Sequence, residues 1–180
     1  MTNDEQPEVD AEDDLRHSVF GFSHSAERLC MACGMCCNGV LFEIVRLQPQ
    51  DSIKELEKLG MQINRRKTEP YFKQPCRMLD GCSCTIYEQR PTRCRRFECL
   101  QLKLLAAGEI TEADAAVKIA EARELVGKVQ TLLADAGDLA TEDSLEERTR
   151  RVLDEHRDSP LAEVMRRLKM LLDHDFRALS

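Results

Sequence analysis

The nine cysteines of this chain constrain its fold more than any other feature, because they are confined to one stretch of the sequence. All of them lie between Cys30 and Cys99 of the 180 residues, and residues 100–180 contain none. This distribution divides the chain into three parts. They are an acidic tail over residues 1–24, a cysteine-rich metal-binding module over residues 25–108, and a helical C-terminal part over residues 109–180.

The N-terminal sequence indicates a reducing compartment. It is acidic where a secretory signal peptide has a basic segment, and no apolar run in the chain is long enough to span a membrane. We therefore expect a cytoplasmic protein without a membrane segment, in which thiols stay reduced. An odd number of cysteines in that compartment argues against a disulfide framework and indicates metal or redox chemistry.

The formal net charge of −7 comes from the start of the chain. Residues 1–14 hold seven acidic side chains and no Lys or Arg, and the charges of the remaining chain balance. An acidic segment without aromatic residues cannot bury enough apolar surface to offset its chain entropy. We predict that the tail, residues 1–24, is disordered.

Capping residues predict three helices in the C-terminal part. The predicted helices cover residues 112–136, 145–156 and 160–176, and their N-caps are Thr111, Ser144 and Ser159. Apolar side chains recur along them at the helical period. These stripes fit a hydrophobic core, or a surface for an unidentified protein partner or for a second copy of this chain in a homodimer.

The cysteine-rich module has a less regular pattern. β-Branched residues predict strands over residues 40–47 and 85–87, and helices are expected over residues 51–59 and 91–107. Residues 62–75 are polar, contain two prolines and are predicted to form a loop. The predicted fold class is mainly α, formally α+β with minimal strand. In it an irregular, metal-organised cysteine-rich module packs on the C-terminal helices.

The first cysteine group has the spacing of a metal-binding loop. Cys30, Cys33, Cys36 and Cys37 form the pattern CxxCxxCC, with Gly34 at its centre to allow a tight turn. In bacterial-type ferredoxin loops, cysteines at the CxxCxxC spacing bind the irons of a four-iron cluster. A CxxC pair also supplies half of a tetrahedral zinc site.

A second cysteine group follows after a long separation. It consists of Cys76, Cys82, Cys84, Cys94 and Cys99. Metal sites commonly draw ligands from two separate segments, because closing the chain around the ion couples binding to folding. Eight thiolates satisfy two four-coordinate zinc sites, or one four-iron cluster with four cysteines to spare, and counting alone leaves both open.

Helix geometry separates two members of the second group. Cys94 and Cys99 are five positions apart, so an unbroken helix over residues 91–107 points them about 140° away from each other. That geometry favours Cys94 as a ligand over Cys99. Both can serve one site only if the helix breaks near Arg96.

The surroundings of the second group are basic. Residues 65–97 contain nine Lys or Arg residues against three Asp or Glu residues. Positive charge stabilises thiolates and suits an anionic thiolate cluster. Nucleic acid is not expected as a partner, because Trp is absent and few aromatic residues could stack on bases.

Three motifs together resemble the YkgJ-like cysteine-cluster (CxxCxxCC) family. They are CxxCxxCC at residues 30–37, PC at residues 75–76 and CTIYEQRPTRCRRFEC at residues 84–99. The family is described as zinc- or iron-chelating, or as containing iron–sulfur clusters. The resemblance implies metal ligation by Cys30, Cys33, Cys36, Cys37, Cys76, Cys84 and Cys94. Cys99 follows in some relatives, and Cys82 is the cysteine that the family pattern explains least.

The resemblance implies metal binding and no particular reaction. Larger relatives, the flagellin lysine methylases, are linked to an iron–sulfur cluster and to methyl transfer. This chain is much shorter and has no recognisable nucleotide or S-adenosylmethionine motif, so the methylase activity is not carried over.

Three hypotheses remain at this point. The favoured one is a protein that holds an iron–sulfur cluster, of the 4Fe-4S type, or iron through its thiolates. The second is a zinc-thiolate module with a structural or partner-binding role. The third is an enzyme, an oxidoreductase or a methyl-transfer protein, that depends on a thiol or a cluster.

Overall fold

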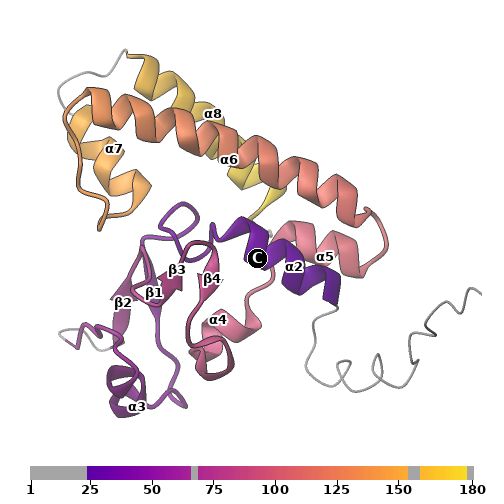
Figure 1. The fold of residues 1–180 in the computed structure, drawn as a ribbon, viewed down its shortest axis with the longest axis vertical. Coiled ribbons are helices and arrows are strands. Elements are labelled where there is room, and N and C mark those ends of the chain that lie inside the picture. Colours follow the sequence, from indigo (N-terminus) through magenta and orange to yellow (C-terminus); the bar gives the residue numbers. More distant parts are fainter. Residues whose placement is uncertain (1–23, 66–68, 154–158, 178–180) are drawn as a thin grey trace, which may run out of the picture.

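The chain is mainly α-helical with two small antiparallel sheets, which confirms the predicted fold class (Figure 1). The computed structural model describes residues 24–65, 69–153 and 159–177. The helices are α2 (His24–Cys33), α3 (Ile53–Lys58), α4 (Thr92–Arg96), α5 (Leu100–Ala106), α6 (Glu112–Asp135), α7 (Leu145–Leu153) and α8 (Pro160–Asp175). The strands are β1 (Ile44–Arg46), β2 (Tyr71–Lys73), β3 (Leu79–Asp80) and β4 (Ser83–Cys84), and η2 (Tyr87–Gln89) is a 3-10 helix.

The predictions for the tail and for membrane segments can be compared with the described residues only in part. The predicted disordered tail falls on residues 1–23, which lie outside the described residues, and on His24, which begins α2. No helix among the described residues is long and apolar enough to cross a membrane.

The three predicted C-terminal helices are present, and each begins where its cap was expected. The Thr111 side chain accepts from the Asp114 N–H, and the Asp114 carboxylate accepts from the Thr111 N–H at 2.9 Å. Ser144 and Ser159 accept from backbone N–H groups of α7 and α8 in the same way. These local bonds satisfy N–H groups that a helix start otherwise leaves unpaired.

The larger hydrophobic core forms where α6 and α8 run side by side (Figure 1). Its completely buried members include Ala115, Ala122, Val129, Leu133 and Leu168. α2 packs on the same core, and Met35, which follows α2, is also completely buried in it. Burial of a side chain of this size contributes about 1.5–3 kcal/mol. The loop that carries the CxxCxxCC motif is therefore anchored on the C-terminal helices.

A smaller core lies under the strands and α3. β1 pairs antiparallel with β2, so that Val45 lies opposite Phe72, and β3 pairs antiparallel with β4. The buried members of this core are Leu47, Leu56, Met61, Phe72, Met78 and Ile86. With so few large side chains, this part of the chain gains little stability from burial alone.

The strand predictions for this part were correct only in outline. The strand expected over residues 40–47 is reduced to β1, and the loop expected over residues 62–75 contains β2. The strand expected over residues 85–87 is wrong, because the chain pairs two residues earlier, as β4, and then turns into η2. Strand pairing depends on the partner strand as well as on β-branched residues, and the partner is not visible in a local pattern.

The single helix predicted over residues 91–107 is also wrong. The chain leaves the helical conformation at Phe97 (φ −74°, ψ 122°) and resumes it at Leu100. The Phe97 ring packs edge-on against Phe42 with ring centroids 5.0 Å apart, and the Leu100 N–H donates to the Phe176 carbonyl at 3.0 Å. These tertiary contacts override helix propensity and separate α4 from α5.

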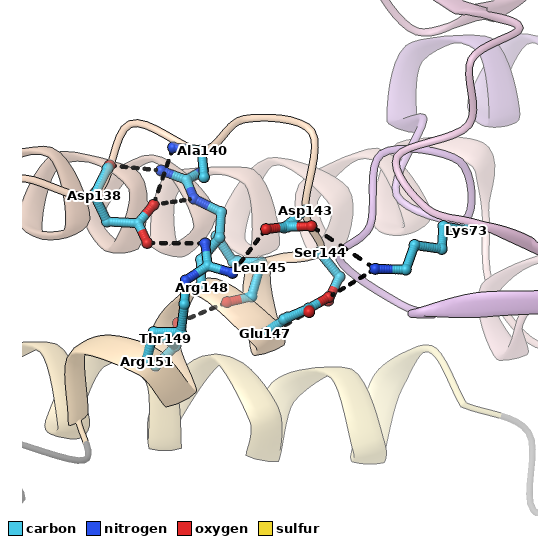
Figure 2. A network of polar contacts seen from close by, with 10 residues as sticks. All are labelled: Lys73, Asp138, Ala140, Asp143, Ser144, Leu145, Glu147, Arg148, Thr149 and Arg151. Carbon is cyan, nitrogen blue, oxygen red and sulfur yellow. Dashed lines mark hydrogen bonds and ion pairs between the residues drawn. The ribbon is translucent and has the colours of Figure 1, made fainter.

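A polar network joins the cysteine-rich part to the start of α7 (Figure 2). Lys73 of β2 pairs with Asp143 at 4.0 Å and with Glu147 at 3.7 Å. The side chains of Asp138 and Arg148, only 9% and 7% exposed, form an ion pair at 2.8 Å, to which Arg151 adds a second at 3.1 Å. The Leu145 N–H donates to the Gly39 carbonyl at 3.1 Å, just after the CxxCxxCC motif. The turn between α6 and α7 is thus fixed against the cysteine-rich part.

Arg148→Met tests the energetic weight of this network. We expect it to lower the free energy of unfolding by about 3 kcal/mol, because the Asp138 carboxylate stays buried without its main partner. Urea denaturation followed by circular dichroism measures the loss. Arg166→Met, at an exposed ion pair with Glu163, is the matched control and should cost less than about 1 kcal/mol. Equal losses in the two variants would contradict a structural role for the network.

Candidate metal centre

The end of α2 and the turn after it deliver the first cysteine group. Cys30 and Cys33 lie in the last turn of α2, and the helix ends at Gly34, whose φ of +65° is left-handed. The Gly34 carbonyl then accepts from the N–H groups of Cys37 at 2.9 Å and of Asn38 at 3.0 Å. A helix end, a glycine turn and the buried Met35 side chain together determine the path of the motif.

Gly34 also lies against the second cysteine group. A Cβ atom built at Gly34 would be 3.3 Å from both Cα and Cβ of Cys82 and 3.4 Å from its Sγ. Glycine therefore meets two requirements here, a left-handed backbone and a close approach to the β3–β4 hairpin.

The second group is brought to the first from three elements. The Cys76 N–H donates to the Cys37 carbonyl at 2.7 Å, and Cys84 lies on β4 opposite Leu79. Cys94 lies on α4, and Cys99 is the N-cap of α5 beyond the break at Phe97.

Eight of the nine cysteines line one cavity of about 420 Å³. The eight are Cys30, Cys33, Cys36, Cys37, Cys82, Cys84, Cys94 and Cys99, and Cys76 is hydrogen-bonded to Cys37 through the backbone. All nine are free thiols that are partly buried. Among the described residues, no three Cys, His, Asp or Glu side chains are gathered closely enough to hold a single ion. The thiols surround a space of the size of a ligand pocket instead of converging on one point.

Burial keeps most of these thiols protonated. It raises the pKa of Cys30, Cys33 and Cys94 to about 12. Neighbouring sulfur charges raise these pKa values further: those of Cys36 and Cys99 act on Cys30, and those of Cys76, Cys36 and Cys84 act on Cys94.

Cys36 behaves in the opposite way. Its Sγ lies 3.6 Å from that of Cys37, and a hydrogen bond from the Cys37 thiol lowers the pKa of Cys36. The same bond raises the pKa of Cys37. Of these two adjacent thiols, Cys36 is therefore the one that ionises more easily.

Backbone N–H groups point at several sulfur atoms. The Met35 N–H donates to Cys33, and the Met78 N–H donates to Cys76. The N–H groups of Gln101 and Leu102 donate to Cys99. Each of these bonds lowers the pKa of the thiol that accepts it. Donors of this kind stabilise thiolates and are characteristic of thiolate metal centres. The donor set and its surroundings therefore fit a metal or an iron–sulfur cluster.

The side chain of Arg90 acts on thiols of both cysteine groups. The positive charge of Arg90 lowers the pKa values of Cys30, Cys36 and Cys94. Arg90 lies 3.5 Å above the Tyr87 ring and donates from Nε to the Tyr87 carbonyl at 2.8 Å, while the Tyr87 hydroxyl donates to Glu27 at 3.1 Å. The sequence indicated a basic neighbourhood but not which arginine faces the thiols.

The structure changes the weight of two predicted ligands. The preference for Cys94 over Cys99 depended on an unbroken helix, which is absent, and both residues line the cavity. Cys82, the least expected ligand, lines it as well. Phe176 at the end of α8 also contributes to the wall, and no pattern in the sequence marks it.

A cavity lined by thiols from five segments is a feature of the class of metal-binding proteins. Residues 29–120, just over half of the chain, match the CxxCxxCC family model, described as "Putative zinc- or iron-chelating domain". The chain belongs to this family, which confirms the resemblance predicted from its motifs. Comparisons with curated proteins and with solved structures return no match.

Gly34→Ala tests the close approach of the two cysteine groups. We expect it to lower both the melting temperature and the bound metal per chain, because a methyl group strains the backbone and pushes against Cys82. Gly108→Ala is the control, since Gly108 has a φ of +71° but no atom within 4 Å of an added Cβ. The control should lose some stability and no metal. If both variants keep their metal, the contact with Cys82 does not shape the site.

Proton release tests the protonation of the buried thiols. Thiols with a pKa of about 12 are protonated at neutral pH, and a metal must displace their protons. Adding zinc chloride to the reduced, metal-free protein in weak buffer should release about one proton per thiol that becomes a ligand, with affinity rising as the pH rises. Magnesium chloride, which prefers oxygen ligands, is the control. Zinc binding without proton release would show that the thiols are ionised before the metal arrives.

Proposed function

We propose that this protein binds an iron–sulfur cluster, of the 4Fe-4S type, through cysteine thiolates in the cavity. The observation that carries the proposal is a single cavity of 420 Å³ whose wall contains eight cysteine thiols. A single zinc ion needs four ligands at most from this set. A four-iron cluster also takes four thiolates, but it is larger than a single ion. It therefore suits thiols that line a cavity and do not converge on one point.

The surroundings of the thiols support a cluster. The CxxCxxC spacing matches that of ferredoxin loops, and backbone N–H groups donate to Cys33 and Cys99. Arg90 contributes positive charge beside an anionic cluster. When bound, such a cluster supplies one-electron transfer. The hydrogen bonds to sulfur and the apolar walls, which include Phe42 and Phe176, are the features by which a protein adjusts a cluster potential.

Zinc is the second candidate, with a structural role. It is favoured by the small core under the strands, which has six buried members among the described residues. A tetrathiolate zinc ion is a common substitute for such a missing core. In that case the cysteine-rich part serves as a stable platform and has no redox function.

Metal analysis of anaerobically purified protein tests this proposal. We expect iron and acid-labile sulfide in equal amounts and a broad visible absorption band, which zinc cannot produce. Cys33→Ser should lose most of the band, because it removes a ligand of the CxxCxxC loop. Val117→Ser, at an exposed position on α6, is the control and should keep it. A colourless protein that contains zinc in whole-number amounts would overturn the iron–sulfur proposal.

A further inference from the structure

The nine sulfur atoms do not form one undivided group. Four of the cysteines pack against the larger core: Cys30, Cys33, Cys36 and Cys99. Three others pack against the smaller core: Cys76, Cys84 and Cys94. No cysteine is shared between the two cores. The boundary between the cores therefore runs through the cysteine cavity.

The backbone assigns Cys37 to the second of these groups. Its carbonyl accepts the Cys76 N–H at 2.7 Å, and besides its neighbour Cys36 the sulfur atoms within reach of its thiol are those of Cys94 and Cys76. Cys36 directly precedes it but packs against the larger core. Each group then contains four cysteines, the number that completes a tetrathiolate site.

The neighbours of the outer thiols follow this division, with Cys36 at the junction. Cys30 and Cys33 both lie within reach of the charges of Cys36 and Cys99. Cys76 and Cys84 act on Cys94, and Cys36 reaches Cys76 and Cys94 as well. The break in the helix at Phe97 explains this division, because it turns Cys99 toward α2 while Cys94 remains beside the β3–β4 hairpin.

We propose that eight of the cysteines form two separate four-thiolate sites. The assignment of a cluster to the first site rests on the proposed function. The first site consists of Cys30, Cys33, Cys36 and Cys99 and binds the four-iron cluster. The second site consists of Cys37, Cys76, Cys84 and Cys94 and binds one zinc ion. The two sites meet at Cys36 and Cys37, whose sulfur atoms lie 3.6 Å apart.

The first group has the ligand order of a cubane site. Three thiolates come from one CxxCxxC loop at the end of α2, and the fourth comes from a distant segment, the N-cap of α5. This is the division between a loop and a remote cysteine that holds four-iron clusters in ferredoxins. The completely buried Met35 fixes the loop between them.

The second group lies where a single ion can cross-link short elements of the chain. Its cysteines connect the CxxCxxCC loop, which packs on the larger core, to the β3–β4 hairpin and α4, whose cysteines pack on the smaller one. Rotation of thiol side chains must close this site as well as the first, since among the described residues no three of the sulfur atoms converge on one ion. An ion that ties three short elements together couples its binding to their folding.

Cys82 is left outside both sites. It packs against neither core, lies beside Gly34 and lines the cavity. In the metal-loaded protein it is the thiol that remains free for reaction with solutes.

Paired cysteine substitutions test the division. The Cys30→Ser/Cys99→Ser variant should lose iron, sulfide and visible absorption but retain about one zinc ion per chain. Zinc-edge X-ray absorption of this variant should give four sulfur ligands at about 2.3 Å. Cys82→Ser is the matched control and should keep both metals. Mass spectrometry after iodoacetamide treatment of the loaded wild-type protein should find one alkylated cysteine, Cys82, with no loss of metal.

The Cys84→Ser/Cys94→Ser variant completes the test, with circular dichroism as the check on folding. If it folds, it should retain the cluster and lose zinc. If it does not fold, a second experiment on the wild-type protein takes its place. Oxidation with ferricyanide destroys the cluster and should release the iron while about one zinc ion stays bound.

The outcomes separate the two proposals. Two zinc ions and no iron in the wild type, of which Cys30→Ser/Cys99→Ser loses one, would overturn the cluster and leave the two sites standing. Loss of both metals from a folded Cys30→Ser/Cys99→Ser variant would overturn the two sites. Loss of metal from Cys82→Ser would do the same.

Discussion

The burial of Met35 in the larger core is the contact on which the cysteine cavity depends. The side chain belongs to the CxxCxxCC loop, yet it is completely buried in the larger core, which α6 and α8 help to build. A loop that ends a helix with a glycine turn has several accessible conformations, and a buried anchor selects one of them. Once Met35 is placed, Cys33 two residues before it and Cys36 directly after it are held in the wall of the cavity. The metal centre is thus assembled on a helical support.

Sequence patterns predicted the features that depend on neighbours along the chain. Thr111, Ser144 and Ser159 begin their helices as expected, because a capping bond spans only three residues. The cysteine spacing predicted the chemistry of the site for a similar reason. The break at Phe97 escaped prediction because it depends on Phe42 and on the Phe176 carbonyl, which are distant in the sequence. The same break decides where Cys99 lies, so one missed tertiary contact obscured the ligand geometry.

Electrostatic balance is the second constraint on the cavity. Burying many sulfur atoms together is unfavourable once they are ionised, as the raised pKa values of Cys30 and Cys94 indicate. Arg90 opposes this effect from a position between the two cysteine groups, and its contacts with Tyr87 limit its freedom. A metal supplies the remaining positive charge, so that occupancy and local stability are linked.

The hydrogen bond from the Leu100 N–H to the Phe176 carbonyl has a consequence for how the molecule can be dissected. The family match ends at residue 120, inside α6. A fragment cut at that point would carry every cysteine but would lack the C-terminal half of α6, all of α8 and the carbonyl that receives the start of α5. The apolar surface that these helices cover would be exposed to water. A low metal content measured on such a fragment would therefore reflect the loss of the helices that hold the cysteines in place, and not a low affinity of the cysteines for metal.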